Sequence, residues 1–148
     1  MNIRIASGED TDSLVEFNQA MALETEGKHL DPATLQSGVE AVFSDEKKGF
    51  YVVAESDSEI VGGLMVTYEW SDWRNKWFWW IQSVYIKPEG RGHGLYRHMY
   101  EFVKEQARIA GNVCGFRLYV ETDNTNAQRV YDAVGMHTSH YLMYEEDV

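Results

Sequence analysis

The sequence predicts an α/β protein with a single mixed, mostly antiparallel sheet of six to seven strands and helices on both faces. Three observations predict it. Strand-like apolar runs follow one another in the middle of the chain, and amphipathic helical stripes precede and follow them. No Pro/Ser-rich linker, internal repeat or low-complexity tract divides the 148 residues. Because this length is sufficient for one hydrophobic core, residues 1–148 are interpreted as a single domain.

The N-terminal half predicts one strand, two helices and a three-stranded meander. Residues 1–6 alternate enough for a first strand, and an apolar stripe at helical spacing indicates a helix from about Glu9 to Glu26. Asp31 followed by Pro32 is typical of the start of a second helix. The strands of the meander are expected at Phe50–Ala54, Ile60–Tyr68 and Trp77–Ile86.

The C-terminal half alternates helices and strands. Apolar residues at helical spacing predict a helix that follows a glycine-rich turn and runs to about Ala110. Alternation over residues 116–120 predicts a strand. Asn124 is a suitable N-cap for a short helix that Gly135 closes. Tyr141–Tyr144 is expected to form the last strand.

Composition restricts the partners of the protein. Asp and Glu number 24 against 13 Lys and Arg, a formal net charge of −11, so the chain is expected to repel nucleic acid. The acidic surface either favours a cationic substrate or is solvated without such a role. No run approaches the roughly 18 apolar residues of a membrane span, and we expect a soluble, cytoplasmic protein. The single cysteine, Cys114, allows no internal disulfide and is expected in the core.

The segment between the third strand of the meander and the following helix is glycine-rich. Such a turn at a helix start leaves backbone N–H groups unpaired in front of the positive end of the helix dipole, which is a receptor for phosphate or pyrophosphate. A nucleotide P-loop or a dinucleotide fingerprint would need residues that this turn lacks. The remaining alternative is a helix start that binds nothing. Basic and histidine side chains gather around the turn: Lys87, Arg91, His93, Arg97 and His98.

Two motifs resemble the GNAT-type N-acetyltransferases, the acetyl-CoA-dependent acyltransferase superfamily. Arg91-Gly92-His93-Gly94-Leu95-Tyr96 is similar to the family's cofactor motif Arg/Gln-x-x-Gly-x-Gly/Ala, and the segment from Asn124 to Met136 resembles its Asn-x-x-Ala-x-x-x-Tyr-x-x-x-Gly-Phe/Met helix. The resemblance covers essentially the whole chain and implies the acyl-CoA N-acyltransferase fold. It departs at Tyr96, which replaces a small residue. The Tyr96 ring either points away from the cofactor or crowds it.

The resemblance implies an enzyme that moves an acetyl group from acetyl-CoA to a primary amine, through a tetrahedral intermediate. A small cationic acceptor is favoured. The alternative is a non-catalytic acyl-CoA-binding sensor or interaction module of the same fold. A backbone N–H near Val84 is implied to stabilise the developing oxyanion, and Val84 and Ile86 to grip the pantetheine amides. The residues implied to bind the cofactor are Val84, Tyr85, Ile86, Arg91, Gly92, His93, Gly94, Leu95, Tyr96, Asn124 and Asn126. The two asparagines cap the helix, contact the cofactor, or do both.

Tyr131 occupies the family's tyrosine position and is implied to protonate the leaving thiolate, although its helical stripe also suits a core aromatic. A lysine-like ammonium has a pKa of about 10.4, so its deprotonation at pH 7 adds about 4.6 kcal/mol to the barrier. A general base is therefore expected. Glu24, on the inward stripe of the first helix, is the first candidate. The competing carboxylates are Glu26, Glu69, Asp72 and Glu121.

The five tryptophans lie close together, at Trp70, Trp73, Trp77, Trp79 and Trp80. Alternation places Trp77 and Trp79 on one face of their strand. About two thirds of the cluster are expected in the core, and the others to wall an acceptor pocket or form a dimer contact. A homodimer is compatible with the resemblance. The five histidines show no metal-ligand spacing, so no metal is expected. Amino acids, polyamines, aminoglycosides and protein amines all remain open as acceptors.

Overall fold

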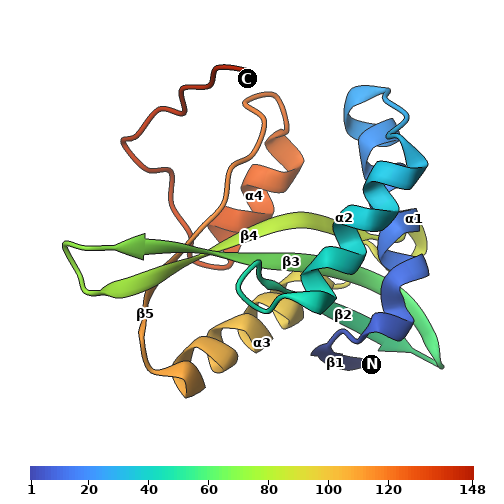
Figure 1. Ribbon diagram of the computed structural model, residues 1–148, viewed down its shortest axis with the longest axis horizontal. Coiled ribbons are helices and arrows are strands. Elements are labelled where there is room, and N and C mark those ends of the chain that lie inside the picture. Colours follow the sequence, from blue (N-terminus) through green and yellow to red (C-terminus); the bar gives the residue numbers. More distant parts are fainter.

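The computed structural model describes residues 1–148, and its five strands form one sheet in the order β1-β2-β3-β4-β5 (Figure 1). Neighbouring strands are antiparallel except β4 and β5, which are parallel. The strands are β1 (Asn2–Ile5), β2 (Phe50–Ser56), β3 (Glu59–Ser71), β4 (Lys76–Ile86) and β5 (Val113–Arg117). The mixed α/β class with one mostly antiparallel sheet is confirmed, with fewer strands than the sequence predicts.

The helices cover both faces of this sheet (Figure 1). α1 (Thr11–Glu26) and α2 (Pro32–Ser44) lie on one face, and α3 (Leu95–Ala110) lies on the other. α4 (Thr125–Ala133) packs beside the first turn of α3. None of these helices combines the length and the apolar character that crossing a membrane requires.

The two faces of the sheet carry two hydrophobic clusters, and β2 contributes to both. Tyr51 and Val53 pack with residues of α1 and α2, whereas Val52 and Ala54 pack with α3. This is the period of two that a strand buried on both faces requires. Burying a full side chain of this kind contributes about 1.5–3 kcal/mol, so the sheet is held firmly between its helices.

The helix starts follow the capping residues read from the sequence. Asp31 Oδ2 accepts a hydrogen bond from the Thr34 amide at 2.9 Å, and Pro32 takes the first helical position. Asn124 Oδ1 likewise accepts from the Ala127 amide at 3.1 Å. The first helix begins later than expected because residues 8–10 form a separate 3₁₀ turn.

The prediction of a last strand at Tyr141–Tyr144 is wrong. Residues 137–148 have no regular secondary structure. A strand needs a partner edge for its backbone groups, and the chain leaves strand geometry after Arg117, three residues before the end of the strand expected at 116–120. The Tyr141 ring lies 6.0 Å from the Arg117 guanidinium, but no backbone ladder joins the two segments. Apolar alternation alone is therefore insufficient here.

Candidate functional site

The connection from β4 to α3 is a tight turn built on left-handed glycines. Residues Pro88–Gly90 form a 3₁₀ turn, after which Gly92 has φ +80° and Gly94 has φ +72°. Gly94 is also the N-cap of α3, and no side chain caps this helix. A Cβ atom at either glycine would meet no neighbour, so backbone conformation rather than crowding explains the residue type.

This turn presents an uninterrupted row of free backbone donors. The amides from Gly92 to Arg97 make no hydrogen bond within the protein, and the first helical bond joins the His98 amide to the Gly94 carbonyl at 3.2 Å. The row stands at the N-terminus of a 16-residue helix, where the dipole adds partial positive charge. Unpaired amides at a helix N-terminus are the arrangement that phosphate-type anions bind in other proteins, and for this turn anion binding stays a prediction.

The basic side chains around the turn do not all remain free. Lys87 Nζ pairs with Glu59 at 2.7 Å, a hydrogen bond that raises the pKa of Lys87. Arg97 instead donates from Nη2 to the Ala133 carbonyl at the end of α4, at 2.7 Å. Its charge has no carboxylate partner, so it adds net positive charge close to the unpaired amides.

A β-bulge in β4 lies just before the turn. Gly63 of β3 is opposite Tyr85 while Met65 is opposite Gln82, so two residues of β4 share one partner position. Ser83 in the bulge has φ +51°. Side-chain direction along a strand has a period of two. The extra residue therefore turns the side chains of β4 after the bulge to the opposite face of the sheet.

Beyond its first half, β4 has an open outer edge. β5 pairs with β4 only from Trp77 to Trp80, and no strand continues beside β4 as far as Ile86. The Lys87 amide donates to Val61 of β3 at 2.9 Å, so alternation directs the amides of Ile86 and Val84 away from β3, toward the open edge. An extended chain with amide groups could add along this edge as a strand does.

Tyr131 and Tyr96 meet where α4 packs on α3. Their rings are 5.3 Å apart in an edge-to-face contact, and burial raises the pKa of Tyr131. The Tyr96 ring is only 5% exposed and stacks on Tyr100 at 5.9 Å. The ring therefore lies in the hydrophobic core, while the Tyr96 amide stays in the row of unpaired donors.

Glu24 lies in the last turn of α1 and already accepts two hydrogen bonds. Tyr85 Oη donates to Oε1 at 3.1 Å, and Arg91 Nη2 donates to Oε2 at 2.9 Å. The Tyr85 ring packs on Phe17 of α1 at 5.3 Å, and burial followed by the Glu24 bond raises the Tyr85 pKa. Arg91 also donates from Nε to the Ile86 carbonyl at 2.8 Å. Sequence reasoning missed this link between α1, β4 and the turn.

The other carboxylates considered as bases have different surroundings. Glu69 Oε1 accepts from Trp80 Nε1 at 2.9 Å and from Arg117 at 2.8 Å. Glu26 pairs with Lys28 at 3.5 Å on the surface. Asp72 and Glu121 make no side-chain hydrogen bond. Glu24 alone among the five links α1 to the turn that carries the unpaired amides.

The remaining predicted residues fall into distinct places. Trp77 and Trp79 pack toward α3, as alternation predicts, whereas Trp70 and Trp73 are 49% and 87% exposed near the β3–β4 hairpin. Cys114 is half-buried, and its thiol lies 3.4 Å from the Trp77 carbonyl.

The Asn124 side chain is used in the helix cap. Asn126 Oδ1 accepts only a long bond, from Arg129 at 3.4 Å. No three His, Cys, Asp or Glu side chains converge as a metal site would require.

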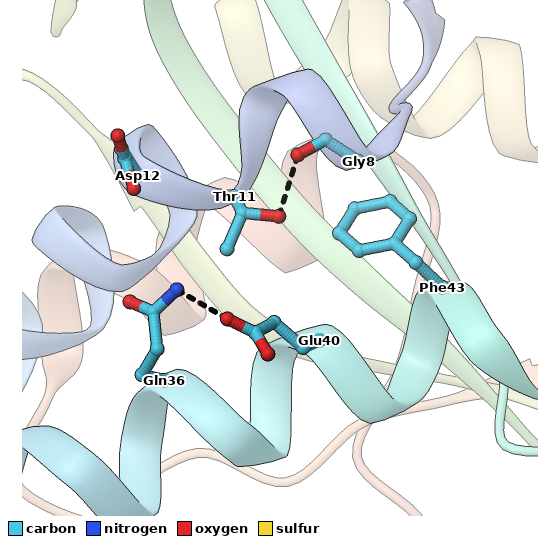
Figure 2. Close-up of a pocket in the computed structure, with 6 residues that line it drawn as sticks. All are labelled: Gly8, Thr11, Asp12, Gln36, Glu40 and Phe43. Atoms are coloured by element: carbon cyan, nitrogen blue, oxygen red, sulfur yellow. Dashed lines mark hydrogen bonds between the residues drawn. The ribbon is translucent and has the colours of Figure 1, made fainter.

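One surface pocket lies away from the glycine turn, between the start of α1 and α2 (Figure 2). It has a volume of about 400 Å³, and its polar groups bond one another: Thr11 Oγ1 donates to the Gly8 carbonyl at 2.7 Å and Gln36 Nε2 to Glu40 at 2.6 Å. A second pocket of about 320 Å³ borders the turn and is lined in part by His93 and His98. The second pocket adjoins the row of free donors, and the first does not.

Comparison with known proteins shows the family and the fold. The sequence matches the acetyltransferase (GNAT) family over residues 12–136. The crystal structure of a possible acetyltransferase from Clostridium difficile 630 superposes with a TM-score of 0.92 at 44% identity, covering 99% of this chain and 97% of that one. A predicted acetyltransferase from Clostridium acetobutylicum, crystallised with acetyl-CoA, has a TM-score of 0.80 at 18% identity, covering 98% and 95%. That second likeness shows the fold.

No curated protein matches the sequence significantly. The family match spans most of the chain, and the Clostridium difficile relative covers almost all of it at well over 30% identity. The protein therefore belongs to the GNAT family of N-acetyltransferases.

Proposed function

We propose that this protein transfers an acetyl group from acetyl-CoA to a primary amine, and that a small cationic amine is its acceptor. The observation that carries the proposal is the row of unpaired amides from Gly92 to Arg97 beside the open edge of β4. These two features are what a diphosphate attached to an amide-bearing arm requires. GNAT enzymes use acetyl-CoA, which has both parts.

The chain's residues fit such a donor. The amides of Gly92, His93, Gly94, Leu95 and Tyr96 would hold the diphosphate, and no side chain fills the space beside the two left-handed glycines.

The amides of Val84 and Ile86 would hold the arm along β4. The Ile86 carbonyl is already engaged by Arg91, so Ile86 offers its N–H alone. Asn124 and Asn126 stand at the start of α4 as further candidate contacts. Bound acetyl-CoA supplies an acetyl group activated as a thioester.

The chemistry assigned to the protein has three parts. A backbone amide near Val84 at the bulge would donate to the oxyanion that forms when the amine attacks. Tyr131 would give its hydroxyl proton to the leaving sulfur. A tyrosine hydroxyl, with an ordinary pKa of about 10, carries this proton at neutral pH.

Glu24 would accept the proton lost by the amine. For this it must exchange Arg91 for the acceptor, and a bound diphosphate offers Arg91 an alternative anion. The net charge of −11 favours a cationic acceptor through long-range attraction.

Release of free thiol from acetyl-CoA, followed with a panel of amines, tests the proposal. We expect turnover with small cationic amines, and an at least 100-fold lower kcat for Tyr131→Phe with acetyl-CoA affinity changed less than threefold. Tyr144→Phe is the matched control, because that ring is 90% exposed. Saturable binding of acetyl-CoA without turnover of any amine would favour the non-catalytic alternative. Absence of binding in calorimetry would remove the proposal.

A further inference from the structure

Tyr96 carries an unexplained polar group. Its hydroxyl is the only buried side-chain nitrogen or oxygen atom in the protein without a hydrogen-bond partner. Native structures rarely leave such an atom unpaired, because burying a hydroxyl without a bond destabilises the fold. Phenylalanine would fill the same space without this cost. A hydroxyl at this position therefore calls for a functional explanation.

The surroundings of the ring limit what that function can be. The Tyr96 ring stacks on the Tyr100 ring with an interplanar angle of 10°. It also makes an edge-to-face contact with the Tyr131 ring, at an interplanar angle of 70°. The titratable side chains whose rings contact Tyr96 are Tyr131 from α4 and Tyr100 from its own helix. Burial, followed by these two hydroxyls, raises the pKa of Tyr96. The neighbouring basic side chain, Arg97, is turned to the Ala133 carbonyl.

We propose that Tyr96 is a positioning residue for Tyr131, whose phenolic oxygen is the partner that the buried Tyr96 hydroxyl lacks. The inference rests on the proposed function, in which Tyr131 protonates the leaving thiolate. When the carbon–sulfur bond breaks, the sulfur takes the Tyr131 proton and Tyr131 is left as a phenolate. The Tyr96 hydroxyl then donates a hydrogen bond to this phenolate without transferring its own proton. Hydrogen bonds to charged acceptors are stronger than neutral ones, so the bond strengthens as the charge forms.

The stack of rings supports this role. Tyr96 is in the first turn of α3, and Phe116 of β5 closes the row against Tyr100 at 5.7 Å. A ring packed on two sides has little rotational freedom, so Tyr96 keeps its orientation beside Tyr131. No hydrogen bond joins the two hydroxyls in this structure, so the bond forms only as the Tyr131 phenolate develops. A fixed donor lowers the reorganisation required when charge develops on its partner.

The test is Tyr96→Phe, measured alone and in a Tyr131→Phe background. We expect kcat to fall about tenfold, which corresponds to about 1.4 kcal/mol, with the KM for acetyl-CoA unchanged. We expect Tm to rise by about 2–4 °C, because the variant removes an unpaired buried hydroxyl. In the Tyr131→Phe background, Tyr96→Phe should change kcat less than twofold, since the two residues act together. Tyr100→Phe is the matched control and should leave kcat within twofold of the wild type.

Each other result overturns the inference. An unchanged kcat would show that the hydroxyl has no role in turnover. An equal loss in both backgrounds would show that it acts independently of Tyr131. A lower Tm would show that the hydroxyl has a structural partner. Absence of turnover in the wild-type protein would instead contradict the proposed function, so the two failures are distinguishable.

Discussion

Replacing Glu24 by glutamine tests the proposed base most directly. Glutamine has the same shape and can still accept from Tyr85, but its NH₂ group would face the Arg91 donor that now lies 2.9 Å from Oε2. The lost ion pair is half-exposed, with Arg91 47% and Glu24 42% accessible, so its loss should cost about 0–1 kcal/mol of stability. The Tm should accordingly fall by less than about 4 °C.

The effect of Glu24→Gln on the reaction should be much larger. A positioned base contributes about 10²–10⁴ in rate, so kcat/KM at pH 7 should fall at least about 100-fold, equivalent to about 2.7 kcal/mol. Because only neutral amine would then react, the rate of the variant should rise about tenfold per pH unit toward the pKa of the acceptor, near 10.4 for a lysine-like amine. The assay is thiol release from acetyl-CoA between pH 6 and 10.

Glu26→Gln is the matched control, since Glu26 is two residues away on the same helix and pairs with Lys28 at 3.5 Å. It should retain the wild-type rate and pH profile. If Glu24→Gln keeps the full kcat/KM for the amine and changes only the KM for acetyl-CoA, Glu24 holds Arg91 in place and does not accept the proton. That result would refute the reasoning.

Two further predictions concern stability. Gly49→Ala should lower the free energy of unfolding by about 3 kcal/mol or more, because φ is +137° and the new Cβ would overlap the carbonyl oxygen of Val66. Urea denaturation measures this change. A loss below about 1 kcal/mol would contradict the prediction. The hydrogen bond from Arg4 holds the pKa of the buried Asp10 below its ordinary value of 3.8, so Asp10 stabilises the fold above about pH 4 and this contribution is lost as pH falls through the lower folded-state pKa. Asp10→Asn should therefore destabilise the protein by about 1.5–3 kcal/mol at pH 7 and flatten the acid limb of its stability profile. An unchanged acid limb would show that other carboxylates control acid unfolding.

Local signals carried the sequence prediction furthest. The caps at Asp31 and Asn124 and the glycine-rich turn before α3 depend on neighbouring residues in the chain, and the structure has all three. Alternation also placed Trp77 and Trp79 together on one face of β4. These features could be read from the sequence because each depends on a few consecutive residues.

The features that the sequence could not predict depend on distant pairs. Glu24 meets Tyr85 across 61 residues and Arg91 across 67, and no local pattern encodes that meeting. The inward turn of the Tyr96 ring likewise depends on α4, which follows about 30 residues later. The prediction of a strand at residues 141–144 was wrong for a related reason, because apolar alternation does not specify which strand edge it would pair with.

The bulge at Ser83 also affects the solvent-exposed, unpaired edge of β4. β4 is an interior strand along its first half and a sheet margin along its second. An unpaired strand edge can pair with a strand of another chain and cause aggregation. Proteins limit this risk by keeping edge strands short, twisted or covered. Here the left-handed residue at 83 twists the margin, and Arg91 occupies the carbonyl of Ile86 at its end. Ser83 and Arg91 should therefore hinder pairing of the open β4 edge with a β-strand of another protein, while a narrow extended ligand can still fit along it.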